Sequence, residues 1–397
     1  MSCLLLRSSN SIAQHAAFQR AQTGSSAVPS TASSPQTLFV GFIIPFEFPL
    51  TCITFTLLTC NRVRLFSRIH TMEDFAQIIS PAHPYCRQFR QVFPIAVDPQ
   101  ADMDIAFTLV VHDDIRQIAR LLRMIYRINN YYCIHIDKRS SIEFQLAMRG
   151  VVTCFGANVE LVPEEERTAM DRGDESALLP QVICAKQALS HHATWKYLIN
   201  LVDQDFPLRT NMELVAALKA LNGSNLVESY KLNKFTRWKN NKLLPQGVIL
   251  GRAVSPLREA MLQPNNIMHP DELFFPTLAY NSQLRLSGAC LYGPSPQSEV
   301  GCNFLGRFVI LEGSNTSCST KYVRDVCILG KDHVALLRSV PHMFANTFQA
   351  DYQPEAYDEL EQWYFQRVMA EIAAAPHDGN PFDPSIYAKR LCSRLHI

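Results

Sequence analysis

The most specific pattern in this chain is Asn130-Tyr-Tyr-Cys-Ile-His-Ile-Asp-Lys-Arg139, followed further along by Trp195-Lys-Tyr-Leu-Ile-Asn-Leu-Val-Asp-Gln-Asp-Phe-Pro-Leu-Arg-Thr-Asn211. In each stretch a short apolar run ends abruptly in acidic and basic residues. A buried parallel strand has this pattern, because its carboxyl end opens into a cleft. In open α/β sheets ligands bind at that end. The two stretches therefore predict a ligand site where neighbouring strands stop.

The flanking sequence extends this sheet. Residues 105–112 read as a further buried strand, and the acidic pair that follows is typical of a helix start. Apolar side chains then fall on one helical face at Ile115, Ile118, Leu121, Leu122 and Ile125. Residues 158–162 and 197–202 read as strands and residues 181–190 as a helix. This alternation predicts an α/β fold, a mostly parallel central sheet with helices on both faces.

Composition narrows the class of protein. The chain has 397 residues, 47% of them hydrophobic, and a formal net charge of +1. This length suits one large globular domain or two medium ones. Near-neutral charge argues against nucleic acid as the main partner, because phosphate binding needs a concentrated basic surface. Neither a dinucleotide-binding fingerprint nor a P-loop motif occurs.

Cysteine usage points to an oxidising compartment. The chain has twelve cysteines, and none forms a Cys-x-x-Cys pair, so a zinc or redox site has little support. Dispersed cysteines in a chain of this size suit disulfides in a lumen. The alternative is several buried free thiols. Two glycosylation sequons, at Asn222 and Asn315, also favour a luminal location.

The N-terminal region divides into three segments. Residues 1–36 are rich in Ser, Ala, Gln and Thr and contain no acid, which predicts a disordered tail. Residues 37–60 are apolar over the length of about 20 residues that a membrane span needs, and predict a signal-anchor helix. The alternative is an apolar segment from an imperfect gene model. Residues 61–103 read as a stem, and residues 104–397 as the luminal domain. Flanking arginines favour the opposite orientation, but the sequons and cysteines favour a luminal body.

From about Ile105 to Lys239 the chain resembles the core-2/I-branching β-1,6-N-acetylglucosaminyltransferase family, also called glycosyltransferase family 14. The resemblance resumes at His269-Pro-Asp-Glu272, at 322–330 and at 342–348. It implies a GT-A-like fold in a single-pass type II Golgi membrane protein with a luminal catalytic domain. It also implies inverting transfer of N-acetylglucosamine from a UDP-GlcNAc donor to a glycan or glycoprotein acceptor, with no metal or other cofactor.

An inverting transfer needs a base for the acceptor hydroxyl and positive charge for the leaving diphosphate. The resemblance implies Glu272 as the base; the alternative is an acidic helix start. It implies Arg324 as one of two cations at the diphosphate. The position of the second, a lysine in the family, is Thr347 here.

The resemblance also implies binding residues for both substrates. Val110, His112 and Asp137 match the uridine-binding positions, although a capping or core role is open for His112. The acceptor-side segment contains Glu228, Lys234 and Arg237, which could instead form a solvated basic loop.

Asp203-Gln-Asp205 has the spacing with which many GT-A enzymes hold Mn²⁺. The family usually has glycine at the first of these positions. We therefore expect a structural role for Asp205 and no metal.

The resemblance further implies three disulfides, which are Cys86–Cys154, Cys133–Cys184 and Cys318–Cys327. Cys60, Cys290, Cys302 and Cys392 have no assigned partner.

Two departures from the family pattern keep other functions open. The chain is shorter than the family over residues 255–268, and it has Thr347 in place of the lysine. One alternative is a catalytically impaired homologue that acts as a luminal binding or scaffold protein. The other is a related xylosyltransferase.

Overall fold

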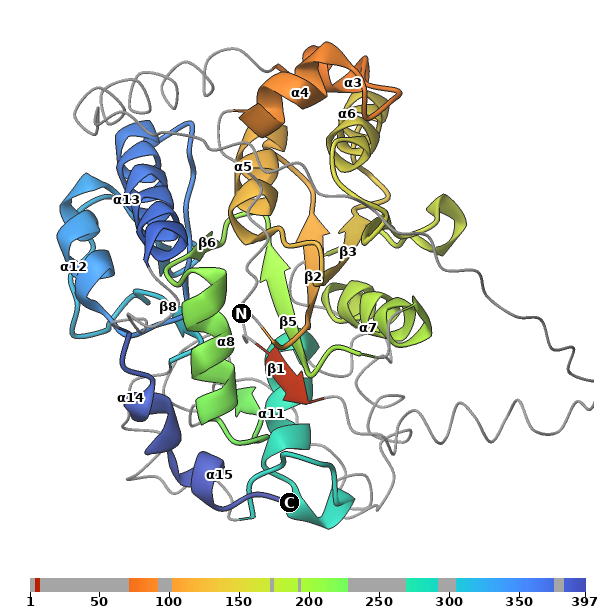
Figure 1. Cartoon of the computed structure of the whole chain (residues 1–397). Coiled ribbons are helices and arrows are strands. Elements are labelled where there is room, and N and C mark those ends of the chain that lie inside the picture. The colour runs from red at the N-terminus through yellow and green to blue at the C-terminus, as the bar shows by residue number, and fades with distance from the viewer. Residues whose placement is uncertain are drawn as a thin grey trace, which may run out of the picture.

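The computed structural model describes residues 4–7, 71–91, 102–171, 175–191, 194–227, 269–291, 305–374 and 382–397. A six-stranded sheet lies at its centre (Figure 1). The strands are β1 (Leu4–Arg7), β2 (Ile105–Val111), β3 (Tyr131–Ile136), β4 (Val159–Leu161), β5 (Tyr197–Val202) and β7 (Leu226–Val227). Their order is β4-β3-β2-β5-β1-β7, and β4, β3, β2 and β5 run parallel. The four strands predicted from the sequence are confirmed to within one residue at each end.

Helices cover both faces of this sheet. The face-covering helices are α5 (Ile115–Ile125), α6 (Ile142–Thr153), α7 (Leu179–His191), α8 (Asn211–Ala220) and α11 (Pro270–Ala279). Alternate side chains of β2 point to opposite faces. Ile105 and Phe107 lie in one core cluster with α5, α6 and α8, whereas Ala106 lies in another with α7 and α11. The predicted α/β fold, GT-A-like with a mostly parallel sheet between helices, is therefore confirmed.

Shorter elements surround the sheet. A third core cluster joins α5 to a C-terminal layer, which Figure 1 shows beside the sheet. Its elements are β6 (Phe206–Pro207), β8 (Arg307–Phe308), β11 (Phe344–Ala345), α12 (Val334–Ser339) and α13 (Pro354–Ala373). The remaining elements are α3 (Met72–Ala76), α4 (Pro84–Gln91), β9 (Tyr322–Val323), β10 (Val326–Cys327), α14 (Ser385–Ala388) and α15 (Leu391–Arg394). Single 3₁₀ turns lie at 164–166, 175–177, 282–284 and 331–333.

The N-terminal region differs from the sequence prediction in two places. Leu4–Arg7, expected in a disordered tail, forms β1 and pairs antiparallel with both β5 and β7. Residues 71–91, expected in a stem, form α3 and α4, whose Phe75 and Phe89 are fully buried in the main core cluster. The rest of the predicted tail and the predicted signal anchor at 37–60 lie outside the described residues. In the described ranges, no helix combines the length and apolarity of a membrane span.

Disulfides connect the layers. The structure forms the three expected bridges, Cys86–Cys154, Cys133–Cys184 and Cys318–Cys327. The first ties α4 to the end of α6, and the second ties β3 to α7. A fourth bridge, Cys290–Cys392, joins residues 102 positions apart and supplies partners for two cysteines that the sequence left unassigned. Cys60 and Cys302 lie outside the described residues.

A buried ion-pair cluster holds α13 against α5. Glu361 is fully buried, and its two carboxylate oxygens accept from Arg120 and Arg123 at 2.5 Å. Burial alone would raise the pKa of Glu361, but the two guanidinium groups outweigh it and hold the pKa below its ordinary value. The cluster is therefore ionised and fixes the C-terminal layer on the sheet.

Replacing Glu361 by Gln is expected to lower the free energy of unfolding by about 3 to 5 kcal/mol, because both buried arginines lose the charge of Glu361 and Arg120 keeps only its ion pair with the partly exposed Asp358. Chemical denaturation monitored by tryptophan fluorescence measures this change. The matched control is Glu359→Gln, which removes a half-exposed ion pair with Arg338 and is expected to change stability by about 0 to 1 kcal/mol. Equal effects of the two variants would contradict the assignment.

Candidate active site

A cavity of about 770 Å³ lies at the carboxyl ends of β2, β3 and β5. It is lined by all five residues predicted for the base, the nucleotide and the diphosphate, namely Val110, His112, Asp137, Glu272 and Arg324. These residues come from distant parts of the chain, and the fold brings them to one site. The predicted acceptor residues Glu228, Lys234 and Arg237 lie outside the described residues.

The nucleotide side of the cavity is formed where β2 and β3 stop. Val110, near the end of β2, is 9% exposed, and His112 follows directly after the strand. Asp137 follows β3, and its backbone N–H donates to the Val111 carbonyl at 3.0 Å. Its carboxylate accepts from the backbone N–H groups of Arg139 at 2.8 Å and Met170 at 3.3 Å. Asp137 is thus fixed at the cavity edge, with acceptor oxygens available for hydroxyl or N–H groups.

His135 supports this edge from inside the sheet. It is fully buried, and its Nε2 accepts from the backbone N–H of Thr168 at 3.0 Å, in the segment that leads to Met170. Burial lowers the pKa of His135 to about 4, although Asp137 works in the opposite direction. The ring is therefore neutral when folded.

Between pH 6.5 and about 4 the unfolded chain protonates this histidine while the folded chain does not. The unfolded state then binds more protons, so the free energy of unfolding falls as the pH is lowered through this range. The expected loss is about 3 kcal/mol. Urea titrations of wild type and His135→Gln at pH 7 and pH 4.5 measure it. The variant should lose less stability than wild type on acidification, and an equal loss would contradict this assignment.

Glu272 lies on the opposite wall. It is 6% exposed and sits in the first turn of α11, where Pro270 and the left-handed backbone of His269 (φ 55°) begin the helix. A helix N-terminus stabilises a carboxylate. Glu272 therefore also fits the alternative in which it is an acidic helix start. The same geometry holds Glu272 in the cavity wall, which is a position that the predicted base role requires.

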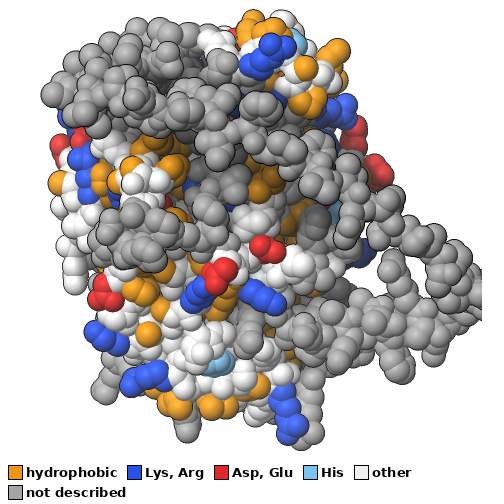
Figure 2. Space-filling view, in the orientation of Figure 1, with side chains coloured by type: hydrophobic (Ala, Val, Ile, Leu, Met, Phe, Trp, Pro, Cys, Tyr) orange, Lys and Arg blue, Asp and Glu red, His pale blue; other side chains and the backbone are white. Residues whose placement is uncertain are grey.

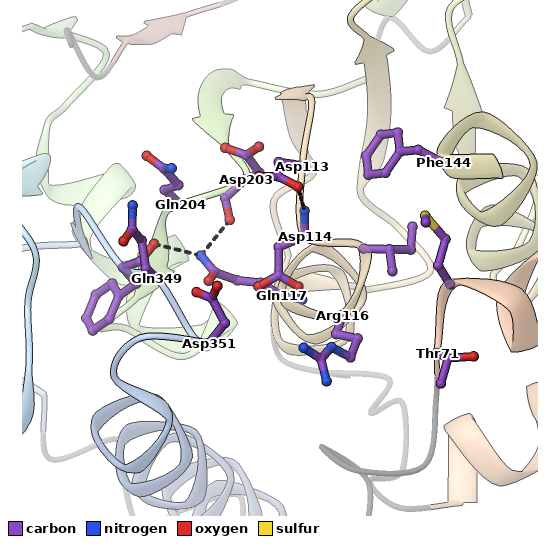
Figure 3. A pocket seen from close by; sticks show the side chains of 13 residues that line it. Thr71, Asp113, Asp114, Arg116, Gln117, Phe144, Asp203, Gln204, Gln349 and Asp351 are labelled. Atoms are coloured by element: carbon purple, nitrogen blue, oxygen red, sulfur yellow. Dashed lines mark hydrogen bonds between the residues drawn. The ribbon is translucent and has the colours of Figure 1, made fainter. Parts of the chain in front are cut away.

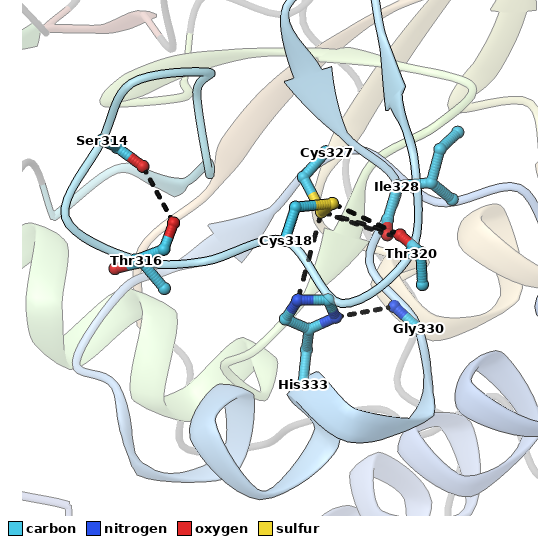
Figure 4. The surroundings of a disulfide bond; sticks show 8 residues. All are labelled: Ser314, Thr316, Cys318, Thr320, Cys327, Ile328, Gly330 and His333. Carbon is cyan, nitrogen blue, oxygen red and sulfur yellow. Dashed lines mark hydrogen bonds between the residues drawn. A yellow bond between two sulfur atoms is a disulfide. The ribbon is translucent and has the colours of Figure 1, made fainter.

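Arg324 is presented by a tight turn between β9 and β10. Both turn residues have left-handed backbones, with φ of 52° at Arg324 and 65° at Asp325. The Cys318–Cys327 disulfide closes the base of this hairpin, and Thr320 and buried His333 lie beside it (Figure 4). The bridge thus limits the positions that the exposed Arg324 side chain can reach.

The third wall comes from the segment after β11. Thr347, at the position of the family's lysine, is 5% exposed, and its hydroxyl donates to the side-chain carbonyl of Gln204 at 2.8 Å. Its neighbour Asn346 donates to Asp205 at 3.1 Å. This wall of the cavity therefore has a neutral hydroxyl at the position where the family that the sequence resembles has a lysine.

The two carboxylates of the Asp203-x-Asp205 pattern serve different partners. Asp205 is fully buried and accepts from Arg307 at 2.8 Å and from the Val202 N–H at 2.8 Å. Asp203 contacts His112, with 2.6 Å between the carboxylate Oδ2 and the ring Nδ1. This second contact was not predicted, because the two residues are 91 positions apart. The sequence contained one indication of this contact, because His112 and Asp203 each lie at the end of a predicted strand.

The described residues on one face of the molecule include both acidic and basic side chains. Near the middle of the face seen in Figure 2, acidic and basic side chains lie next to one another. The small net charge of +1 agrees with this distribution.

Comparison with known proteins identifies the family. The Core-2/I-Branching enzyme model matches residues 105–268. The chain is 28% identical over 348 residues to human "Beta-1,3-galactosyl-O-glycosyl-glycoprotein beta-1,6-N-acetylglucosaminyltransferase". This match covers 76% of the chain and 79% of the relative. The protein with the same description from Bos taurus is 30% identical over 345 residues, with 76% and 79% coverage. A Mus musculus "N-acetyllactosaminide beta-1,6-N-acetylglucosaminyl-transferase" is 28% identical over 317 residues, with 70% and 77% coverage.

The family-model match includes strands β2 to β7 of the structure. The parallel strands, the site at their carboxyl ends and the similarity over most of the chain agree with one another. The chain is a glycosyltransferase that belongs to the Core-2/I-branching enzyme family.

Proposed function

We propose that this protein transfers N-acetylglucosamine from UDP-GlcNAc to a hydroxyl of a glycan acceptor, with inversion and without a metal ion. The observation that carries the proposal is the single cavity in which Glu272 and Arg324 meet His112 and Asp137. The cavity combines the carboxylate of Glu272, the guanidinium of Arg324 and the polar side chains of His112 and Asp137. Sugar transfer from a nucleoside diphosphate requires a base and positive charge of this kind.

In the proposed reaction, Val110, His112 and Asp137 hold the uridine end of the donor. Glu272 takes the proton of the acceptor hydroxyl as its oxygen bonds to C1 of the sugar. The bond from C1 to the diphosphate oxygen breaks on the opposite face, which inverts the anomeric carbon. UDP leaves with the electron pair, and Arg324 stabilises its developing charge.

Metal independence is supported by the engagement of nearby carboxylates with protein groups. Asp205 holds Arg307 and Asn346, and Asp203 holds His112. Arg324 provides the positive charge that a divalent cation would otherwise supply.

Two acceptor classes follow from the names of the relatives. One relative is named for a β-1,3-galactosyl-O-glycosyl-glycoprotein, the other for an N-acetyllactosaminide. We propose β-1,6 transfer to one of these, with Glu228, Lys234 and Arg237 on the acceptor side.

Calorimetric titration in EDTA tests the donor. We expect UDP-GlcNAc to bind with higher affinity than UDP-xylose, and UDP to bind without added metal. Preference for UDP-xylose would favour the xylosyltransferase alternative. Donor binding without any transfer would favour the impaired homologue, and metal-dependent binding would contradict the proposed chemistry.

We also propose a luminal Golgi location with attachment through residues 37–60. A single span there would place Leu4–Arg7 across the membrane from β5, whereas β1 pairs with β5 in one sheet. The two arrangements exclude one another in the same molecule, so an anchored molecule has released the β1 pairing.

Glycosylation and tag protection test this location. Asn222 and Asn315 are both exposed, so both are expected to carry N-glycans that peptide-N-glycosidase F removes. Substitution of each by Gln should remove one glycan. In intact microsomes an N-terminal tag should be digested by added protease if residues 37–60 span the membrane. A protected tag would contradict the anchor and support the β1 pairing, and an unglycosylated chain would contradict the luminal location.

A further inference from the structure

Asp203 makes an unusual double contact with the residue at the end of β2. One carboxylate oxygen, Oδ2, lies 2.6 Å from the His112 ring Nδ1 and accepts the His112 backbone N–H at 3.2 Å. The Asp203 side chain is 5% exposed, whereas the His112 side chain is 35% exposed in the cavity. The nearly buried Asp203 carboxylate thus fixes the Nδ1 side of the partly exposed His112 ring.

The backbone of Asp203 is itself fixed. The side-chain amide of Gln117, which is 2% exposed, donates to the carbonyl oxygens of Asp203 at 2.9 Å and Phe348 at 3.2 Å (Figure 3). Its side-chain oxygen accepts the Ala350 N–H at 2.8 Å. Helix α5 therefore anchors the Asp203 segment to the wall that contains Thr347, and Asp203 is in place before any ligand arrives.

We propose that Asp203 is a positioning residue for nucleotide recognition, which rests on the proposed donor role of His112. In the neutral ring, the carboxylate favours the tautomer with the proton on Nδ1, because it accepts from Nδ1–H. The other ring nitrogen, Nε2, is then a hydrogen-bond acceptor. An acceptor at this point matches the N3–H of uracil and mismatches cytosine, whose N3 carries no hydrogen. Asp203 thereby gives the site a preference for uridine over cytidine nucleotides.

Two measurements test this role on the full chain with the variants Asp203→Ala and Asp203→Asn. The first is ¹⁵N NMR of the unliganded protein labelled at histidine, which reports which ring nitrogen carries the proton. Wild type is expected to show Nδ1–H at His112, and Asp203→Ala is expected to show Nε2–H. A wild-type Nε2–H tautomer would overturn the proposal.

The second measurement is the ratio of UDP to CDP affinity, together with kcat and KM for the donor. Removing Asp203 is expected to weaken UDP binding and lower this ratio by about three- to tenfold, the effect of one hydrogen bond. KM for the donor should rise while kcat changes little. The isosteric Asp203→Asn preserves the packing and an amide oxygen that can still accept from Nδ1–H, so it should lower the ratio less than Asp203→Ala does. Equal loss of UDP and CDP affinity in both variants would overturn the proposal.

Asp113→Asn is the matched control, because it removes a nearby exposed negative charge that contacts Asp114 rather than His112. It is expected to leave both the tautomer and the UDP-to-CDP ratio unchanged. If this control lowers the UDP-to-CDP ratio as much as the Asp203 variants do, the effect comes from net charge and the proposal is overturned. If wild type binds UDP but the ratio is insensitive to Asp203, this inference fails alone. If wild type binds neither nucleotide, both this role and the proposed function fail.

Discussion

Replacement of Glu272 by Gln is expected to lower kcat for sugar transfer by about 10²- to 10⁴-fold, the contribution that a positioned general base makes. Gln has nearly the same shape and keeps one acceptor oxygen, but it cannot take the proton of the acceptor hydroxyl. Glu272 is 6% exposed in the cavity wall, and the nearly identical shape of Gln leaves the packing there nearly unchanged. Donor affinity should stay within about threefold of wild type, because the lost interaction is made in the transition state.

The neighbouring acid separates this role from a purely structural one. Asp271 lies in the same first turn of α11 and shares the helix N-terminus. If the two acids only start the helix, Asp271→Asn and Glu272→Gln should have similar small effects on stability and activity. We expect Asp271→Asn to retain most of the transfer rate. Retained transfer by Glu272→Gln would show that another group is the base.

The second large effect is a gain. Thr347→Lys is expected to raise kcat/KM by about 10- to 100-fold, because a second cation at the leaving diphosphate stabilises the charge that develops there. Thr347 lines the cavity wall and is 5% exposed, so a longer side chain can extend into the cavity. The family resemblance places a lysine at this position. Steady-state kinetics with varied UDP-GlcNAc measures the change.

Thr347→Met is the matched control, because it adds length without charge and also removes the hydrogen bond to Gln204. It should give no gain. The gain from lysine should shrink as salt is added, since a solvent-accessible phosphate site is screened. No increase with Lys, or an equal increase with Met, would contradict the view that charge at this wall limits the reaction.

The sequence predicted the parallel strands well because each is a buried apolar run that ends in polar residues. β2 and β3 are buried along their whole length, so their pattern does not depend on distant partners. The family resemblance implied Asp137 and His112 as nucleotide-binding residues, and their places at the ends of these strands agree with it. Parallel strands align their carboxyl ends, and a residue that follows a strand reaches the shared edge.

Other features depend on pairing between distant residues and have no local signal. β1 pairs Leu5 with Ile199, and nothing in its short apolar run specifies that partner. The Cys290–Cys392 bridge joins residues 102 positions apart, and connectivity cannot be deduced from cysteine positions alone. The Asp203–His112 contact likewise requires β2 and β5 to be neighbours, which only the folded sheet specifies.

The central claim is that this cavity transfers N-acetylglucosamine in a β-1,6 linkage. The purified protein should be incubated with UDP-GlcNAc in EDTA, with a β-1,3-galactosyl-O-glycosyl acceptor and with an N-acetyllactosamine acceptor in separate reactions. NMR of the product then gives the linkage and anomeric configuration. We predict a β-1,6-linked product on one acceptor, formed without metal, more abundant with Thr347→Lys and lost with Glu272→Gln. The absence of product from both wild type and Thr347→Lys, or a product with another linkage, would contradict the claim.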